Sequence, residues 1–433
     1  MTKDILSLFL LPGLKSTERS LKCGYVSMDL STMQYYLVSL EVVTITGLTT
    51  TSSVPPDLKE NLLIWSNEML KLKFQIIIGM TSISALTEER DKKIFLTGAT
   101  GFIGSHILRL LLKQGYRHIT CLKRNTSDTS LIADIADKCD WIVGDMEDYP
   151  LMEEALYGQD VVINAAAQVT FDLKNKNKLL KDASDSAASI VNASLHHQVS
   201  KFIHISSIAA LGRRKLKDYI DEKSIFSHSP YDTTYGHAKF LAEQEVWRGH
   251  AEEGLNVTIL NPSMVLGVGN WNASTPQMFA RIYNGMQFYP SGVNGWVDVR
   301  DVAQAVIITL EGNFTGERYI ISSENLPYVD ILNMIADGLK VRRPSSPVTL
   351  SNGPLYWRLD ALKSFFTGSE PILTKETFMS TSVHAFYDNQ KSIKELNMNY
   401  RCVRETIHET CEAFLSSYPS GKAFSYPSGL FSL

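Results

Sequence analysis

The chain has 433 residues, of which 44% are hydrophobic, and its formal net charge is −4. This length corresponds to two or three typical domains with ordinary buried cores. Because there is no basic excess, the composition argues against a nucleic-acid partner or an anionic membrane surface and favours small neutral or anionic ligands.

The cysteines are scattered and form no Cys-x-x-Cys pair: Cys23, Cys121, Cys139, Cys402 and Cys411. This pattern argues against a disulfide framework and a structural zinc site, so we expect no metal and a reducing compartment, the cytoplasm. The apolar stretches at 5–14 and 74–86 are shorter than the roughly 20 residues that a membrane-spanning helix needs, so no membrane contact is predicted.

Both ends of the chain differ from its middle. Residues 1–91 show weak periodicity, and we interpret them as an N-terminal extension whose role the sequence does not reveal. The tail, 416–433, contains "SYPSG" twice, and its Pro, Gly and Ser content predicts a flexible end.

From Lys93 onward, short apolar runs alternate with helical patterns, as in successive βαβ units. The runs lie at 92–98, 118–124, 140–145, 160–167, 201–207 and 255–262. Because they are almost continuously apolar, they predict an α/β fold with a Rossmann-type doubly wound parallel sheet, buried on both faces. We assign this NAD(P)-binding domain to 92–262 and 298–318. The segments 263–297 and 319–415 lack the alternation and are predicted to form a smaller substrate-binding lobe.

The first predicted strand is followed directly by "TGATGFIG", which opens a helical pattern. In a dinucleotide-binding loop, Gly98 permits the tight turn, Gly101 lets the backbone approach the pyrophosphate, and Gly104 allows close helix packing. The helix N-terminus adds N–H donors and a partial positive charge. The loop residues predicted to contact a cofactor also include Thr100, Phe102 and Ile103. A glycine turn without a ligand is the alternative.

The end of the second predicted strand indicates which dinucleotide is bound. An acidic residue there would bind the ribose 2′-hydroxyl of NAD, whereas this chain has Lys123 and Arg124. A guanidinium can pair with a 2′-phosphate in a bidentate way, so NADPH is the preferred cofactor and NAD the alternative.

Ahead of the predicted tail, three Tyr-x-x-x-Lys sequences offer a proton donor for carbonyl chemistry, because this spacing places both side chains on one face of a helix. Tyr219/Lys223 lies in a charged, proline-flanked connection, and Tyr387/Lys391 has no strand-end serine before it. Both are predicted to be surface pairs.

The third copy, Tyr235/Lys239, begins a clear helix between two predicted strands. Ser207 lies 28 residues upstream of Tyr235 at the tip of a strand and can reach the same cleft. Two hydroxyl groups that converge on one substrate oxygen, with a lysine behind them, form a working proton-transfer site. Ser207, Tyr235 and Lys239 are therefore the predicted catalytic residues.

Several motifs in order resemble the extended branch of the short-chain dehydrogenase/reductase superfamily, in the NAD-dependent epimerase/dehydratase group. The motifs are "TGATGFIG", "GDMED", "NAAA", "HISSIAALG", "YGHAK", "NPSMVLGVG" and "GWVDVRDVAQA", and the likeness covers roughly 92–415. The resemblance implies the same catalytic roles, cofactor contacts from Tyr235 and Lys239, and a homodimer. It further implies adenine contacts from Asp145 and Met146, a cofactor wall from Ala165, Ala166 and Ala167, and a nicotinamide-facing pair, Pro262 and Ser263.

Two positions depart from the family pattern. An Asn-x-x-Gly-Thr sequence usually precedes the strand at 201–207, whereas this chain has "DASDS" at 182–186. The common Arg-Pro after the sixth strand is replaced by Asn261-Pro262.

The leading hypothesis is an NADPH-dependent reductase of ketones or aldehydes, similar to dihydroflavonol reductases. Ser207 would orient the carbonyl oxygen, Tyr235 would donate the proton, and Lys239 would tune Tyr235 and hold the nicotinamide ribose. The partner is then a small-molecule carbonyl or alcohol substrate. Two alternatives stay open: a nucleotide-sugar epimerase or dehydratase with tightly bound NAD, and a non-catalytic NADPH-binding scaffold.

Overall fold

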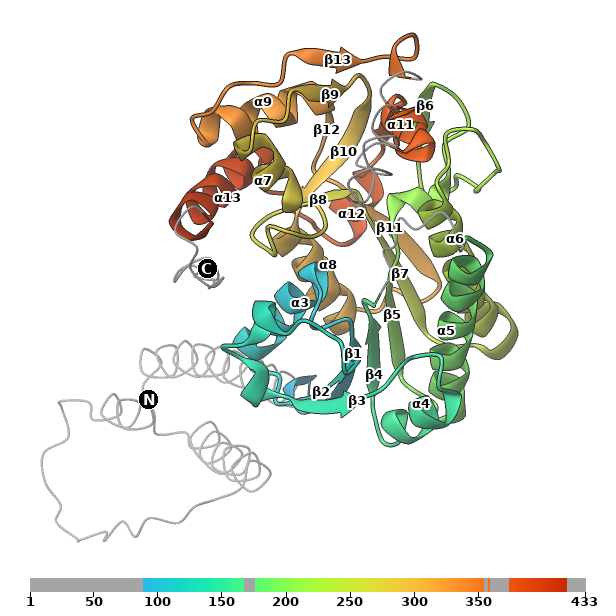
Figure 1. The fold of residues 1–433 in the computed structure, drawn as a ribbon. Coiled ribbons are helices and arrows are strands. Elements are labelled where there is room, and N and C mark those ends of the chain that lie inside the picture. The colour runs from blue at the N-terminus through green and yellow to red at the C-terminus, as the bar shows by residue number, and fades with distance from the viewer. Residues whose placement is uncertain (1–88, 167–175, 354–356, 359–373, 419–433) are drawn as a thin grey trace, which may run out of the picture. The chain divides into compact units, whose positions relative to one another are not determined.

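The computed structural model describes residues 89–166, 176–353, 357–358 and 374–418 (Figure 1). The predicted N-terminal extension lies outside these residues except for 89–91, and the predicted tail except for 416–418.

A seven-stranded sheet with the order β11-β7-β5-β4-β1-β2-β3 forms the centre of the described residues. All of its neighbouring strands pair in parallel, which confirms the predicted Rossmann-type α/β fold. The strands are β1 (Lys93–Thr97), β2 (His118–Lys123), β3 (Asp140–Val143), β4 (Val161–Asn164), β5 (Lys201–Ile205), β7 (Val257–Pro262) and β11 (Glu317–Ile321).

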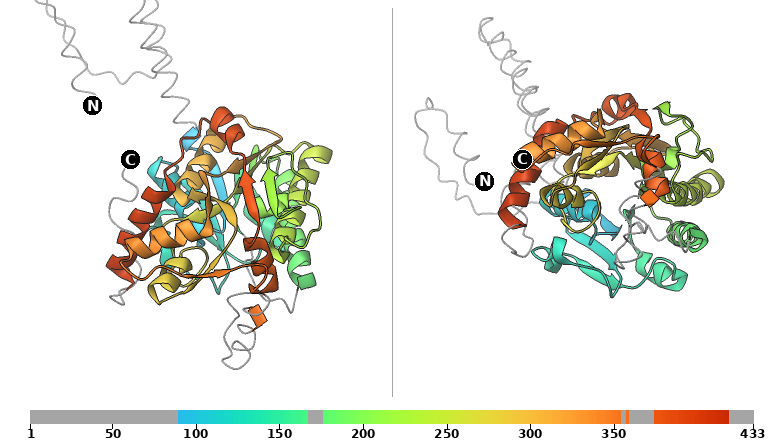
Figure 2. Two further views of the ribbon diagram at one scale, coloured as in Figure 1. Left: turned by 90° about the horizontal axis from the view of Figure 1, so that it is seen from above. Right: turned by 45° about the horizontal axis from the view of Figure 1, so that its top comes forward.

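Helices cover both faces of this sheet (Figures 1 and 2). One face carries α3 (Phe102–Lys113) and α8 (Val299–Glu311), and the other carries α4 (Tyr149–Leu156), α5 (Lys176–His196) and α6 (Thr234–Glu253). Within β1, Ile94 and Leu96 pack toward α3 and α8, whereas Phe95 packs toward the other three helices. Because each face needs its own apolar side chains, the strands are apolar at nearly every position.

The direction of chain progression reverses beside β1. From β1 the chain moves through β2 and β3 to one edge, and β4, β5, β7 and β11 then continue on the other side of β1. In open α/β sheets such a reversal separates the loops that follow the two central strands and leaves a crevice at their carboxyl ends. A ligand site is therefore expected at the loops after β1 and β4.

The remaining elements form a second lobe around a five-stranded sheet, in which β12, β10, β14 and β6 follow one another and β8 pairs with β10. Its elements are β6 (Lys217–Ile220), β8 (Met264–Leu266), α7 (Gln277–Tyr283), β9 (Phe288–Pro290), β10 (Val293–Asp298), β12 (Glu324–Pro327), α9 (Tyr328–Gly338), β13 (Ser346–Val348), α11 (Lys375–Thr381), β14 (His384–Tyr387), α12 (Gln390–Glu395) and α13 (Val403–Ser417). Trp271 and Trp296 are buried in its core. The domain boundaries proposed from the sequence stay a prediction.

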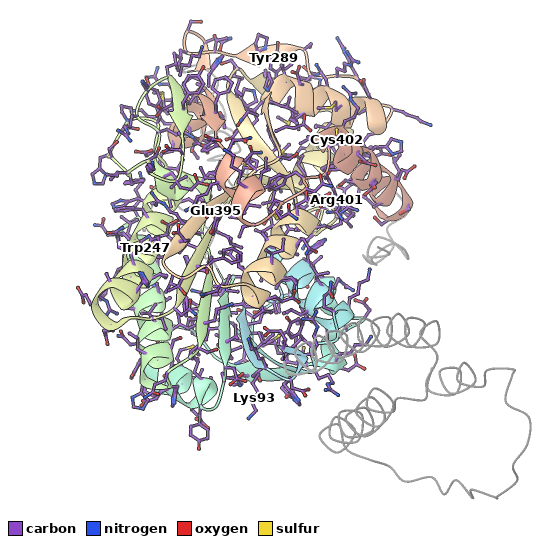
Figure 3. The ribbon with its side chains drawn as sticks, turned by 180° about the vertical axis from the view of Figure 1, so that it is seen from behind. Lys93, Trp247, Tyr289, Glu395, Arg401 and Cys402 are labelled. Carbon is purple, nitrogen blue, oxygen red and sulfur yellow. The ribbon has the colours of Figure 1, made fainter. Side chains whose placement is uncertain are left out.

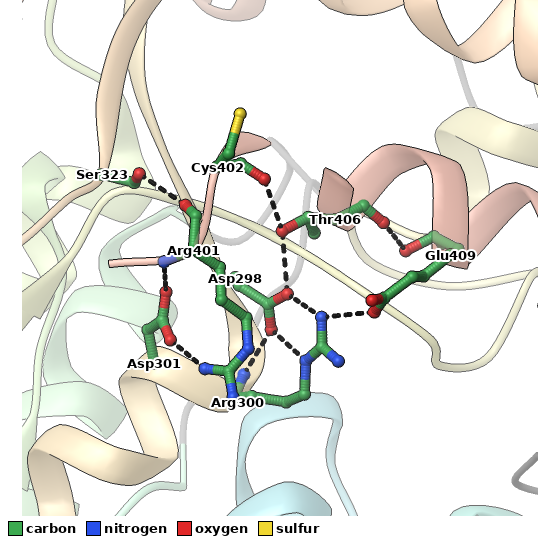
Figure 4. Close-up of polar contacts among 9 residues, drawn as sticks. Asp298, Arg300, Asp301, Ser323, Arg401, Cys402, Thr406 and Glu409 are labelled. Carbon is green, nitrogen blue, oxygen red and sulfur yellow. Dashed lines mark hydrogen bonds and ion pairs between the residues drawn. The ribbon is translucent and has the colours of Figure 1, made fainter. Parts of the chain in front are cut away.

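Charged groups join α13 of this lobe to α8 (Figure 4). The Asp298 carboxylate caps α8, pairs with Arg300 at 2.6 Å and accepts a hydrogen bond from the Thr406 hydroxyl at 2.8 Å. Asp301 pairs with Arg401, which precedes α13. Burial raises the pKa of Asp301 to about 6 although Arg401 opposes the shift. These contacts hold the second lobe against the seven-stranded sheet.

Figure 3 views the molecule from behind and shows the seven-stranded sheet and the second lobe at opposite ends. Lys93, at the amino end of β1, lies at the opposite end from Tyr289 in β9, and Arg401 and Cys402 lie between them. The carboxyl ends of the sheet strands therefore point toward the second lobe.

Candidate active site

The loop after β1 is fixed by steric contacts of its glycines. Gly98 has φ = +72°, a conformation that side chains disfavour, and a Cβ there would lie 2.6 Å from the backbone of Ala165 and Ala166. A Cβ on Gly104 would lie 2.0 Å from the Gly98 carbonyl oxygen. These two glycines let the β1 loop approach the β4 loop and let α3 begin directly beneath it.

Gly101 differs, because the chain itself leaves space around it. It is exposed, and a Cβ there would meet only the Gly98 oxygen, at 3.3 Å. The Gly101 N–H donates to that oxygen at 2.9 Å, and Gly101 is the N-cap of α3. Open space above a helix N-terminus with free N–H groups suits a pyrophosphate, so the loop fits a dinucleotide.

A series of hydrogen bonds through buried side chains supports the loop after β4, and the sequence did not predict it. The Ala166 N–H donates to the Thr97 hydroxyl at 3.1 Å, and that hydroxyl donates to Asn164 at 2.8 Å. The Asn164 amide contacts Nδ1 of His204 on β5 at 3.3 Å. Ala165 and Ala166 are thereby held beside Gly98, whereas Ala167 lies outside the described residues.

The predicted 2′-phosphate site lies at the end of β2. Lys123 Nζ is 5.1 Å from the centre of the Trp141 ring. Arg124 is exposed; its backbone N–H donates to Ser127, and its guanidinium forms no ion pair within the part of the chain that the structure describes. Asp145 and Met146 follow β3, the next strand of the sheet, and are half-buried. A cation without a partner is thus available at the predicted position.

Ser207 and Tyr235 meet where β5 ends and α6 begins. Ser207 caps the short 3₁₀ helix η5 (Ile208–Leu211) by accepting the Ala209 N–H at 3.1 Å. Thr233 caps α6 by accepting the Gly236 N–H at 3.0 Å. A Cβ on Gly236 would lie 2.8 Å from the Ala209 oxygen, so η5 packs tightly on the first turn of α6.

The electrostatics of the predicted catalytic residues follow from their burial. Burial raises the pKa of the Tyr235 phenol, and a side-chain hydrogen bond with Ser207 opposes this shift. Lys239 Nζ donates to the Ile205 carbonyl at 2.9 Å. Burial lowers the pKa of Lys239 to about 8, and the nearby Glu243 carboxylate opposes the shift. The three side chains share one partly desolvated site at the carboxyl end of β5.

A buried polar cluster behind Lys239 was missed by sequence reasoning. Asn261 Nδ2 donates to the Ser207 carbonyl at 3.0 Å and to Glu243 Oε1 at 2.5 Å. Arg318 on β11 lies 3.3 Å from Glu243 Oε2. Asn261, which replaces the family's arginine, therefore links the Ser207 loop to α6, while Arg318 supplies the counter-charge. The position of Glu243 four residues after Lys239 was the available signal.

The two other Tyr-x-x-x-Lys copies have different surroundings. Tyr219 is 70% exposed and Lys223 is exposed, so the prediction of a surface pair is confirmed there. The same prediction is wrong for Tyr387, which is buried on β14. Lys391 pairs with Glu317 at 2.5 Å and lies above the Tyr319 ring.

Pro262 and Ser263 are buried at the end of β7, where the Ser263 N–H donates to the Ile321 carbonyl at 3.0 Å. Within the described residues, no group of three His, Cys, Asp or Glu side chains could hold a metal ion. The same part of the chain contains no helix with the length and apolar character needed to span a bilayer.

The model of the NAD dependent epimerase/dehydratase family matches residues 94–322, which is more than half of the chain. The chain belongs to this family. It is an NAD(P)-dependent oxidoreductase that acts on C=O or CH–OH groups.

Individual relatives agree with the family assignment. A Synechocystis sp. protein, provisionally assigned as a dihydroflavonol 4-reductase, is 24% identical over 329 residues, which cover 74% of this chain and 94% of the relative. Cinnamoyl-CoA reductase 1 of Petunia hybrida is 26% identical over 335 residues, with 74% of this chain and 91% of the relative covered. The crystal structure of gox2253 matches with a TM-score of 0.66 at 30% identity, covering 75% of this chain and 98% of that one.

Proposed function

We propose that this oxidoreductase reduces a ketone or aldehyde with NADPH, with Ser207, Tyr235 and Lys239 as its catalytic residues. The observation that carries the proposal is that the Ser207 hydroxyl lies beside the Tyr235 phenol at the carboxyl end of β5, with Lys239 one helical turn behind. Reductases among the relatives support the direction of the reaction.

The bound cofactor supplies hydride to the carbonyl carbon. The Ser207 hydroxyl orients the carbonyl oxygen, and the Tyr235 hydroxyl donates a proton to the oxygen as negative charge develops there. Because burial raises the pKa of Tyr235, the phenol is protonated before reaction and is ready to act as the acid. The Lys239 ammonium stabilises the phenolate that remains.

Three groups of contacts would hold the cofactor. The N–H groups of the Gly98–Gly104 loop would bind the pyrophosphate, and Lys239 would hold the nicotinamide ribose. Arg124 is the reason to prefer NADPH over NAD, because its exposed guanidinium pairs with a 2′-phosphate where an acidic residue would reject it. Pro262 and Ser263 would face the nicotinamide, and Asp145 and Met146 would face the adenine.

The test is a cofactor-oxidation screen of the full chain over ketones, aldehydes and nucleotide sugars, with NADPH and NADH in parallel. We expect NADPH-dependent turnover of at least one ketone or aldehyde. The Tyr235→Phe variant should lose about 100-fold or more in kcat, since general acid catalysis typically contributes that much. Tyr219→Phe is the matched control, because Tyr219 is exposed, and should retain activity. Full activity of Tyr235→Phe would reject the proposed site, and tightly bound NAD with turnover of a nucleotide sugar would reject the reductase.

A further inference from the structure

Arg213 lies six residues after Ser207, at the point where the chain leaves the site. Gly212 has φ = +72° and turns the backbone out of η5 into Arg213. The Arg213 N–H donates to the Asp232 carboxylate at 2.9 Å, and its carbonyl accepts a hydrogen bond from the Ser229 hydroxyl. The backbone at Arg213 is therefore held firmly in relation to the Ser207 loop.

The Arg213 guanidinium has no carboxylate partner within the described part of the chain. Its Nε donates to the Tyr387 hydroxyl at 3.1 Å, and no ion pair to Arg213 occurs there. The Asp232 carboxylate is occupied by the N–H groups of Arg213 and Ser229, the latter at 3.0 Å. Buried charges usually form ion pairs. Asp232 is near enough to attract the Arg213 guanidinium but forms no ion pair with it in the described part of the chain.

Tyrosines surround the guanidinium and do not neutralise it. Burial raises the pKa of both Tyr387 and Tyr328, so their phenols are uncharged near pH 7. The Tyr328 hydroxyl accepts a hydrogen bond from the Asn294 side chain at 2.9 Å. The Nη groups of Arg213 thus keep their donors for a ligand with several acceptor oxygens.

The guanidinium is also near the predicted position of the nicotinamide. A Cβ built on Gly295 would lie 3.1 Å from the Tyr387 ring and 3.0 Å from the Ser263 Cβ. Tyr387, which accepts the Arg213 hydrogen bond, is therefore a close neighbour of the residue predicted to face the nicotinamide. A substrate whose carbonyl lies between Ser207 and Tyr235 can extend toward this wall of the second lobe.

We propose that Arg213 binds an anionic group, a carboxylate or a phosphate, on the carbonyl substrate. Guanidinium groups recognise both through paired hydrogen bonds. Arg214, the next residue, is exposed on the surface. This inference rests on the proposed function and narrows its substrate class.

Matched substrate pairs test the inference with the full chain and NADPH. One pair is 4-carboxybenzaldehyde and the neutral methyl 4-formylbenzoate, and the other is glyceraldehyde 3-phosphate and glyceraldehyde. We expect kcat/KM to be about tenfold or more higher for the anionic member of at least one pair, which identifies the preferred anion. Arg213→Gln should bring this ratio close to one by raising KM for the anionic member alone, and Arg213→Lys should restore part of it. Arg214→Gln, at an exposed neighbour, should leave the ratio unchanged.

Equal kcat/KM for charged and neutral members in the unaltered chain would overturn the inference while leaving the reductase intact, and this result needs no variant to fold. If no carbonyl in the panel is reduced, the proposed function is in question, and anion binding decides the inference separately. Calorimetry should then show that benzoate or inorganic phosphate binds the NADPH-loaded chain and binds Arg213→Gln at least tenfold more weakly. Equal binding by both chains, or binding by neither, would overturn it.

Discussion

The phosphate loop and the catalytic cluster are neighbours but are built by different physical means. In the loop, the positions of Gly98 and Gly104 are determined by backbone contacts as short as 2.0 Å for an added Cβ. In the cluster, buried side chains from α6, β7 and β11 hold Lys239 and Ser207 through hydrogen bonds and charge. Function in the phosphate loop therefore depends on residues that have no Cβ, whereas function in the catalytic cluster depends on the charge states of specific side chains.

Replacement of the site lysine should have the largest effect. Lys239→Met removes the ammonium that stabilises the Tyr235 phenolate, so we expect kcat to fall about 100-fold or more. Lys391→Met is the matched control, because Lys391 has the same spacing from a tyrosine but pairs with Glu317 on β11. Steady-state kinetics with NADPH measure both. Equal losses in the two variants would show that the cluster has no special role.

The phosphate loop can be tested by replacing Gly104, which is closely packed, and Gly101, which has open space around it, in separate variants. Gly104→Ala should destabilise the chain by about 1–3 kcal/mol or more, because its Cβ would overlap the Gly98 oxygen. Gly101→Ala should leave thermal unfolding nearly unchanged but weaken NADPH binding, since its Cβ enters the space where the pyrophosphate is expected. Calorimetric unfolding and cofactor titration distinguish the two. Normal cofactor binding by a folded Gly101→Ala variant would refute the assigned pyrophosphate position.

The charge dependence of the cluster should appear in the pH profile. Burial lowers the pKa of Lys239 to about 8, and the groups that interact with it electrostatically are Glu243 on α6 and His204 on β5. Because the ammonium form is the active one, kcat/KM should fall as pH rises through about 8. Glu243→Gln removes the group that raises this pKa, so the alkaline limb should move to lower pH.

Glu317→Gln serves as the control for this shift, since Glu317 pairs with Lys391 and not with Lys239. Its pH profile should match that of the unaltered chain. An unshifted limb in Glu243→Gln would mean that Glu243 does not act on Lys239. The stability of the fold should change with pH in the opposite direction to activity. Because the pKa of Lys239 is lower in the folded chain, its charge disfavours folding below about pH 8, and this cost disappears as pH rises toward the ordinary pKa of 10.5.

The smallest expected effect concerns cofactor choice at the edge of the loop. Arg124→Ala should raise KM for NADPH about tenfold and leave KM for NADH unchanged, because only the 2′-phosphate contact is lost. KM for NADH serves as the internal control, because NADH lacks the 2′-phosphate. A similar rise for both cofactors would indicate a contact shared by NAD and NADP.

The loop could be predicted from sequence because its requirements lie within seven consecutive residues after an apolar strand. The sheet followed from the same local patterns. Ser207, Tyr235 and Lys239 were selected by the helix and strand around them, which correctly set aside Tyr219 as exposed. Their catalytic roles stay a prediction that the kinetic experiments test.

The supporting residues could not be predicted, because the sequence does not show which distant segments meet. Asn261, Glu243 and Arg318 come from three elements, and only the fold brings them together. Tyr387 was misplaced on the surface because the pairing of β14 with β6 and β10 that buries it is long-range. Arg213 carried no signal beyond a basic run, since the tyrosines that surround it lie more than one hundred residues away.

A crystal structure of the full chain with NADP and a bound carbonyl compound tests the central claim most directly. We predict that the nicotinamide ring lies beside Pro262 and Ser263, with the Ser207 and Tyr235 hydroxyls both in hydrogen-bond reach of the substrate oxygen and the 2′-phosphate against Arg124. A nicotinamide ring remote from Tyr235, or a substrate oxygen that contacts neither hydroxyl, would contradict the account.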